Sequence, residues 1–271
     1  MMEKANDLIL QMEKCIANVD PIKVEGKLKV GVDLGTANIV ITVLDSNDIP
    51  VAGAIYPADV VRDGIVVNFV EAVQIIRKLK AQLEKQLGRE LIYAATAIPP
   101  GIMEGNVRVI KNVVEGGGFI VTNVLDEPTA AANILNINSG AVVDIGGGTT
   151  GISILKDGKV IYSADEPTGG RHLTLVTAGA LNMEYEDAEE YKKDINNYNM
   201  VFTMVRPVIE KMSSIIQKHI KGYNIDTIYL VGGTCCLKNI ENVVEEYTGV
   251  KTVKTYNPLL ATPLGIAISV K

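Results

Sequence analysis

The hydrophobic and polar positions at the start of the chain recur with the period of a helix. Within the first nineteen residues the apolar side chains are spaced three or four apart: Leu8, Ile9, Met12, Cys15, Ile16 and Val19. This spacing predicts an amphipathic helix, which Pro21 and Gly26 end. Its apolar side would dock on the body of the protein; the alternative is a detachable helix that binds a partner or targets the protein.

From residue 29 onward, short apolar runs alternate with helical spacing. Three strands joined by tight turns are expected at residues 29–35, 38–45 and 51–56. A helix at 70–87, a strand at 91–100, a helix at 103–114, a strand at 119–127 and an alanine-rich helix opened by Pro128 follow. This alternation predicts the α/β class.

A strand-turn-strand pattern occurs twice. When Asp33 is aligned with Asp144, residues 29–48 and 140–159 match at the aspartates, at the glycine two residues later and at the apolar positions around them. A duplication explains this similarity most simply. The two copies would build two similar lobes whose turns face each other across a cleft.

The second half of the chain has its own order of elements. A helix at 173–181, a charged segment at 184–194, a long helix at 200–219 and a strand at 226–234 are expected, before a final helix or strand after residue 257. The charged segment has the composition of a solvated helix face. We therefore predict three parts of the chain. They are an N-terminal helix and linker (1–26), a first lobe (27–140) completed by the C-terminal segment 259–271, and a second lobe (141–258).

The histidines and cysteines give little sign of metal or redox chemistry. Neither His172 nor His219 has a metal-binding companion, so both are expected at the surface or as helix caps. Cys15, Cys235 and Cys236 lack C-x-x-C spacing, which is unlike a disulfide framework or a zinc site. The adjacent pair would be two buried small residues at a strand end, with an iron–sulfur or redox site as the alternative.

Charge and hydropathy narrow the classes of partner. The net charge is -6 and no run of Lys or Arg occurs, so nucleic acid is not an expected partner. No apolar run reaches the roughly 18 residues of a membrane span, and the N-terminus lacks a secretory signal. We therefore expect a soluble, cytoplasmic protein.

Glycines follow the second aspartate in a suggestive pattern. Gly146, Gly148 and Gly151 match the spacing of a dinucleotide-binding turn, but such a turn needs a helix directly after it. Here the run ISIL at 152–155 follows, which is β-branched and aliphatic in character, so the glycines belong to a hairpin. Two facing hairpins would cradle a polyphosphate with their N–H groups, while the paired aspartates hold magnesium through its water shell. The alternative is purely structural, with aspartates that cap turns and glycines that permit them.

Five short sequence motifs occur along the chain in the order found in a known superfamily. GVDLGT, DEPTAAA, VVDIGGGTTGISIL, YLVGGT and PLGIAI run from Gly31 to Ile268. They resemble the phosphate 1, connecting, phosphate 2, adenosine and second connecting motifs of the actin-like and DnaK-type chaperone ATPase superfamily. VVRDGIVVNF, TGGRHLT and DAEEYKK look most like the ethanolamine utilization J-type family, whose members are regarded as chaperone-like and associated with bacterial microcompartments. The resemblance implies an actin-like ATPase fold, with two duplicated RNase H-like lobes around a nucleotide cleft and reduced upper subdomains.

The resemblance also implies ATP and Mg²⁺ as ligands. Asp33 and Asp144 would lie near magnesium, and Glu127, Asp144 and Thr149 would be the catalytic residues, Glu127 acting on the attacking water and Thr149 contacting the γ-phosphate. The remaining nucleotide contacts would come from both turns, from an A-E-x-x-K pattern and from the adenosine turn: Gly35, Thr36, Gly146, Gly147, Gly148, Thr149, Glu189, Lys192, Gly232, Gly233 and Thr234.

The chain also departs from the DnaK-type pattern. The catalytic lysine expected between the first hairpin and residue 91 has no clear counterpart, which implies slow hydrolysis. The upper part of the second lobe, which normally walls the purine, looks reduced or absent, which implies weaker nucleotide binding. No C-terminal peptide-binding domain follows, which puts client folding by the DnaK mechanism in doubt.

The residues and the resemblance leave three functions open. In the first, ATP-driven lobe closure acts on enzymes or shell proteins of ethanolamine catabolism, in the cytoplasm or at a microcompartment. The second is an actin-like structural or scaffold protein with little or no ATP turnover. The third is a small-molecule kinase, for whose acceptor pocket the short chain leaves little material. Whether the protein is an enzyme stays open between a weak ATPase and none.

Overall fold

Two sheets of identical topology form the frame of the protein. The computed structural model describes residues 2–62 and 64–271. One five-stranded sheet has the order β3-β2-β1-β6-β7 and the other the order β10-β9-β8-β11-β12. In each sheet three antiparallel strands are followed by two parallel pairings. The repeated topology is what a duplicated unit produces.

The helices at 69–87 and 104–116 pack against the first sheet over a core of aliphatic side chains. Its elements are β1 (Lys29–Leu34), β2 (Asn38–Leu44), β3 (Pro50–Pro57), the short pair β4 (Val61–Arg62) and β5 (Ile65–Val66), α2 (Phe69–Leu87), β6 (Tyr93–Ile98), α3 (Glu104–Gly116), β7 (Ile120–Asp126) and α4 (Glu127–Leu135). Local signals set the bounds of α2. The Asn68 side chain caps its first turn, and Gly88 ends it in the left-handed conformation at φ 63°.

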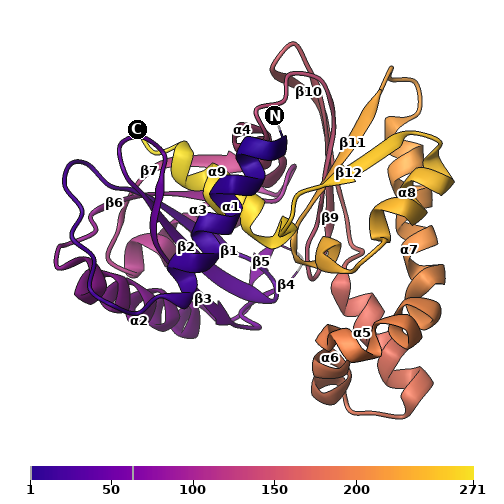
Figure 1. Ribbon diagram of the computed structural model, residues 1–271, viewed down its shortest axis with the longest axis horizontal. Helices are drawn as coiled ribbons and strands as arrows, with labels where there is room; N and C mark the ends of the chain where they lie inside the picture. Colours follow the sequence, from indigo (N-terminus) through magenta and orange to yellow (C-terminus); the bar gives the residue numbers. More distant parts are fainter. Residues whose placement is uncertain (1, 63) are drawn as a thin grey trace.

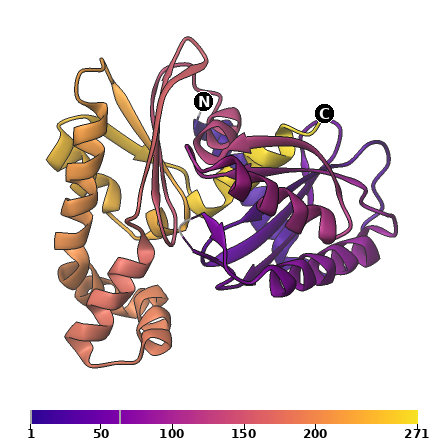
Figure 2. The ribbon, with the colours of Figure 1, turned by 180° about the vertical axis from the view of Figure 1, so that it is seen from behind.

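The second sheet packs mainly against the long helix α7 and the shorter α8. Its elements are β8 (Gly140–Ile145), β9 (Thr150–Lys156), β10 (Lys159–Glu166), α5 (Gly170–Leu181), α6 (Tyr185–Lys193), α7 (Tyr198–Ile220), β11 (Thr227–Val231), α8 (Ile240–Thr248), β12 (Lys251–Lys254) and α9 (Ala261–Ile268), with 3₁₀ turns at Ile195–Asn197, Gly233–Cys236 and Pro258–Leu260. Helices α5 and α6 project from one end of this lobe (Figures 1 and 2).

The final element is a helix that returns to the first sheet. The Thr42 hydroxyl of β2 donates to the Pro263 carbonyl at 2.8 Å, and α9 also packs against β1 and β6. Helix α9 crosses α4 so closely that a Cβ at Gly265 would overlap the Ala130 carbonyl. Glycine is therefore required at this crossing, where the two connecting helices meet.

The N-terminal helix α1 (Met2–Ala17) is docked on the body of the protein (Figure 1). It buries Ala5, Leu8, Ile9 and Met12. A Cβ at Gly53 of β3 would meet the Met12 sulfur at 2.6 Å. The predicted amphipathic helix is thus confirmed, with its apolar side packed as core. No helix among the described residues has the length and apolar character needed to cross a membrane.

Two side-chain predictions need correction. His219 is not a surface residue, because its side chain is only 11% exposed and links Tyr162 (2.6 Å) to Glu166 (2.8 Å). His172 does act as a cap, accepting the Gly169 N–H at 3.3 Å. Of the adjacent cysteines, Cys235 is buried but Cys236 is exposed, since the chain turns outward in a 3₁₀ turn directly after β11.

Candidate functional site

The two hairpin turns face each other, as the duplication predicts. The first turn joins β1 to β2 and the second joins β8 to β9. A Cβ placed on Gly147 would lie 3.3 Å from the Cβ atoms of both Thr36 and Ala37. The absence of a side chain at Gly147 therefore allows the turns to approach closely.

An inner cavity of about 80 Å³ lies beside these turns. Most of the predicted phosphate, magnesium and catalytic residues line it: Asp33, Gly35, Thr36, Glu127, Asp144, Gly146, Gly147, Thr149, Gly232 and Gly233. Gly148 is buried and does not line it. The structure therefore brings residues from both hairpins, α4 and the turn after β11 to one place.

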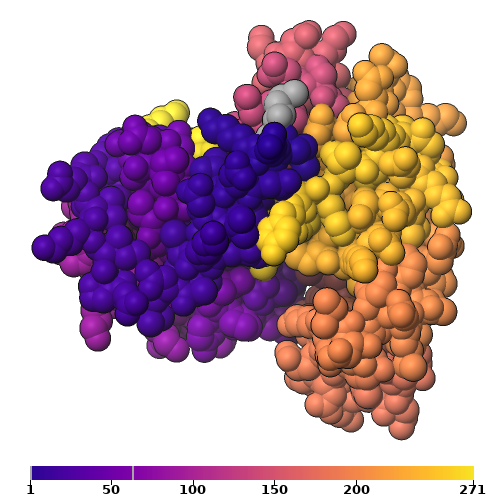
Figure 3. Space-filling model, in the orientation of Figure 1, coloured from indigo at the N-terminus to yellow at the C-terminus, as the bar shows by residue number. Residues whose placement is uncertain are grey.

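A larger outer cavity of about 740 Å³ adjoins the inner one. Its lining includes Glu189, Lys192 and Thr234, as predicted for a nucleoside site. The residues that line both cavities form a neck between them: Ala37, Asn38, Gly147, Gly233 and Leu259. In the space-filling view the surface is notched between the first lobe and the orange helical region (Figure 3).

Asp144 is held rigidly at the end of β8. It is 7% exposed, and its Oδ2 accepts the Thr262 hydroxyl at 2.7 Å. A Cβ at Gly232, where φ is 91°, would overlap the Asp144 carboxylate. Gly232 was predicted only as part of an adenosine turn, and Thr262 was not predicted at all. Thr262 lies 118 residues away in α9, so no local pattern marks it.

The carboxylates in the inner cavity are difficult to ionise together. Burial, with the Asp144 charge, raises the pKa of Asp33 to about 7. Burial raises the pKa of Asp144 to about 6, although the Thr262 hydrogen bond opposes it. Burial, then the charges of Asp144 and Asp33, raise the pKa of Glu127 well above its usual value. No Lys or Arg is found among the described residues that line this cavity, so the cluster suits a bound cation.

The fit to magnesium is nevertheless incomplete without a second ligand. Nowhere in residues 2–62 and 64–271 do three Asp, Glu, His or Cys side chains gather closely enough to hold a metal ion by themselves. Magnesium prefers six oxygen ligands and usually keeps several waters, with phosphate oxygens completing its shell. The two aspartates therefore fit a magnesium that arrives with a polyphosphate.

The second hairpin turn is attached to the first turn of α5. The N–H groups of Gly170 and Arg171 donate to the carbonyls of Gly146 (3.0 Å) and Gly147 (2.9 Å). The Thr234 hydroxyl donates to the same Gly146 carbonyl at 2.7 Å. These bonds explain why α5 begins at Gly170, earlier than the predicted start at residue 173.

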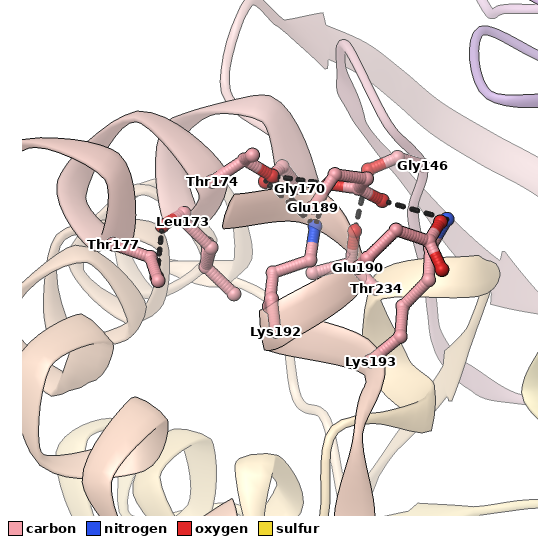
Figure 4. A network of polar contacts seen from close by, with 10 residues as sticks. All are labelled: Gly146, Gly170, Leu173, Thr174, Thr177, Glu189, Glu190, Lys192, Lys193 and Thr234. Atoms are coloured by element: carbon pink, nitrogen blue, oxygen red, sulfur yellow. Dashed lines mark hydrogen bonds and ion pairs between the residues drawn. The ribbon is translucent and has the colours of Figure 1, made fainter. Parts of the chain in front are cut away.

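Glu189 and Lys192 face the outer cavity and belong to a buried network (Figure 4). The Lys192 ammonium contacts the Glu189 carboxylate at 2.6 Å and the Thr174 hydroxyl at 2.7 Å, and Thr174 also donates to Glu189. The Glu189 side chain is 22% exposed and the Lys192 side chain 14%. Burial raises the pKa of Glu189, but the charge and hydrogen bond of Lys192, with smaller contributions from Thr174 and Lys193, lower it more. The pKa of Glu189 therefore lies below its usual value.

These contacts decide between alternatives that the sequence left open. The segment around Glu189 is not simply a solvated helix face, because α6 turns Glu189 and Lys192 toward α5. The upper part of the second lobe, expected to be reduced or absent, is present. Helices α5 and α6 occupy that position and supply Arg171, Leu173, Tyr185 and Glu189 to the outer cavity.

Comparisons with known proteins agree with this architecture. Residues 128–265 match the family model of the type IV pilus assembly protein PilM, and residues 51–186 match that of the MreB/Mbl protein. The chain is 16% identical to a PilM–PilN type IV pilus biogenesis complex structure, covering 89% of this chain and 97% of that one, with a TM-score of 0.75. It is 16% identical to MreB 5 of Spiroplasma citri bound to AMPPNP, with coverages of 90% and 96% and a TM-score of 0.73. These likenesses establish the actin-like ATPase fold.

Other relatives are much more similar in sequence. Ethanolamine utilization protein EutJ of Escherichia coli K12 is 43% identical over 96% of this chain and 92% of its own length. Its counterpart from Salmonella typhimurium LT2 is 44% identical with the same coverage. The crystal structure of EutJ from Carboxydothermus hydrogenoformans is 45% identical, covers 98% of both chains and has a TM-score of 0.93. The chain therefore belongs to the EutJ family of ethanolamine utilization proteins, and it has the actin-like ATPase fold.

Proposed function

We propose that this protein binds ATP with magnesium between its lobes, and that nucleotide binding and release close and reopen them to act on enzymes or shell proteins of ethanolamine utilization. One observation carries the proposal: two facing turns and three carboxylates surround an inner cavity that opens through a neck into a larger one. Phosphates in the inner cavity and a nucleoside in the outer one match this sequence of chemical environments.

Different residues of the inner cavity would bind the phosphates, the magnesium ion and the attacking water. Backbone N–H groups of the turns containing Gly35 and Gly147 bind phosphate oxygens. Asp33 and Asp144 hold magnesium through its waters, and when bound the ion neutralises phosphate charge. Glu127 orients water or accepts its proton.

Turnover is proposed to be slow. Transfer of a phosphoryl group is accelerated by a cation that stabilises the charge developing on the transferred phosphate. The described lining of the inner cavity supplies carboxylates, hydroxyls and glycines but neither Lys nor Arg. The protein would then act as a nucleotide-dependent switch with weak ATPase activity.

The partner class rests on the relatives. The similar proteins are named for ethanolamine utilization, and one structural neighbour is a complex of PilM with a second protein, PilN. Enzymes or shell proteins of a microcompartment are therefore the proposed partners, and the cytoplasm or the microcompartment the proposed location. The second candidate is an actin-like scaffold that keeps this fold without turnover.

Thermal unfolding with nucleotides tests the proposal. Mg-ATP and Mg-ADP should each raise the melting temperature, whereas magnesium alone should not, because the protein groups do not hold the ion by themselves. Asp144→Asn should abolish the magnesium-dependent shift. Asp157→Asn makes the same charge change at an exposed turn of the neighbouring hairpin and should retain the shift.

Phosphate release and partner binding separate the two candidates. A shift without phosphate release supports the switch, and no shift at millimolar nucleotide supports the scaffold. Binding of purified shell proteins that differs between the ATP and ADP states would support nucleotide-driven closure. Equal binding in both states would contradict it.

A further inference from the structure

An ion pair joins the two lobes beside the outer cavity, which Arg171 lines. Arg171, in the first turn of α5, contacts Asp59 across 112 residues of sequence, with Nη1 and Oδ1 3.1 Å apart. Asp59 lies between β3 and β4 of the first lobe. It also binds Arg62 of its own lobe, with Oδ2 and Nη2 2.7 Å apart. The Arg171 guanidinium lies 5.6 Å from the ring centroid of Tyr185, which lines the outer cavity.

Each partner of this ion pair is attached to the hairpin turn of its own lobe. The Arg171 N–H donates to the Gly147 carbonyl at 2.9 Å. Ala58, next to Asp59, donates its N–H to the Ala37 carbonyl at 3.1 Å. Gly147 and Ala37 are also the residues at which the two turns meet and which line the neck. A change in the separation of the turns is therefore transmitted directly to the ion pair.

We infer that Arg171 and Asp59 form a clasp between the lobes, tied to the two turns that line the neck, and that this clasp limits the rate at which nucleotide leaves. The inference rests on the proposed nucleotide site. Because the turns approach closely at Gly147, phosphates held in the inner cavity leave when the turns separate. That separation moves the first turn of α5 away from Asp59 and breaks the ion pair. Arg171 is thus a positioning residue that acts through the turns.

The clasp is ionised and exposed, which sets the size of its effect. Hydrogen bonding to Arg62 is the main reason that the pKa of Asp59 lies below its usual value, and the Arg171 charge adds to it. The side chains of Arg171 and Asp59 are 35% and 54% exposed. Exposed ion pairs contribute little and are screened by salt, so losing the clasp should speed release by about two- to fivefold.

Release of ADP with a fluorescent N-methylanthraniloyl group measures this rate. The labelled nucleotide is bound with magnesium and chased with excess unlabelled ATP in a stopped-flow instrument. Asp59→Asn and Arg171→Gln should each release it about two- to fivefold faster. The double variant should be no faster than the single ones, because both remove the same interaction. Added salt should accelerate release in the unaltered protein more than in the variants.

Arg62→Gln is the matched control, because it removes the Asp59 partner that does not cross between lobes. It should leave the release rate unchanged. Tight binding with equal release rates in all variants would overturn the clasp while leaving the proposed function intact. An equal acceleration by Arg62→Gln would also overturn it. Failure of the unaltered protein to bind the labelled nucleotide would overturn both proposals.

Discussion

The two hairpins share one sequence pattern and one topology, yet their aspartates lie in different surroundings. Asp144 is 7% exposed and accepts the Thr262 hydroxyl, and its turn is bonded to α5 through Gly146 and Gly147. No described residue donates a hydrogen bond to the Asp33 carboxylate, and its turn is bonded to the backbone of Ala58. The second copy of the duplicated unit, which contains Asp144, is therefore held by more hydrogen bonds than the first copy, which contains Asp33.

The difference appears in the charges of the two aspartates. Both pKa values are raised by burial, but that of Asp33 reaches about 7 and that of Asp144 about 6. The Thr262 hydrogen bond favours the ionised form of Asp144, whereas the Asp144 charge further disfavours ionisation of Asp33. Duplication therefore reproduces the position of a carboxylate, while its neighbours decide how readily it ionises.

The largest expected change in the free energy of unfolding comes from replacing Gly232, the glycine that packs against the Asp144 carboxylate. Gly232→Ala should lower the free energy of unfolding by about 3 kcal/mol, because a Cβ there would overlap the Asp144 carboxylate and the Ile145 carbonyl in a positive-φ backbone that L side chains rarely adopt. Urea unfolding measures the change. Gly88→Ala is the control: φ is also positive, at 63°, but nothing lies within 4 Å of its Cβ, so about 1 kcal/mol is expected. Equal losses would show that the overlap at Gly232 is unimportant.

A second prediction separates the two aspartates by pH. Their folded-state pKa values exceed the usual value near 4, so the folded protein holds more protons than the unfolded chain between about pH 4 and pH 7. Without nucleotide, the free energy of unfolding should therefore fall as pH rises through this window, and the raised pKa of Glu127 acts in the same direction.

Asp33→Asn should reduce this pH dependence by removing the carboxyl with the higher pKa, and Asp144→Asn should reduce it by removing its own raised pKa together with the charge that raises the pKa of Asp33. Urea unfolding at a series of pH values, with a chelator present, measures the slope. Asp157→Asn, at an exposed turn, should leave the slope unchanged. The comparison fails if Asp33→Asn retains the full slope of the unaltered protein.

The smallest expected effect compares two threonines that support the two sides. Thr262→Val removes the hydroxyl that binds Asp144 and should lower the free energy of unfolding by about 1.5 kcal/mol above pH 6, and by less below it, where the carboxyl is protonated. Thr42→Val removes a hydroxyl that donates to the neutral Pro263 carbonyl of α9. It should lower the free energy of unfolding by about 1 kcal/mol at every pH. Chemical unfolding at pH 5 and pH 8 tests this; identical pH behaviour would contradict the charge-assisted bond.

Several elements were predictable because their signals are local. The expected helix at 70–87 agrees closely with α2, since Asn68 and Gly88 mark its ends. The facing turns and the cluster of Asp33, Asp144 and Glu127 were also anticipated, because the duplication and the ordered motifs mark them. The contact of α6 with Thr174 was not, because charge composition does not reveal which face of a helix another helix covers.

By itself the sequence determined the duplicated lobes, the family and the positions of the paired aspartates, because these depend on residues close together in the chain or on motifs in a fixed order. Tertiary structure alone decided that Thr262 binds Asp144, that Gly232 accommodates that carboxylate and that Arg171 reaches Asp59. Each of these contacts joins segments far apart in sequence. The pKa of a carboxyl likewise depends on the burial and charge around it, which form only when the chain has folded.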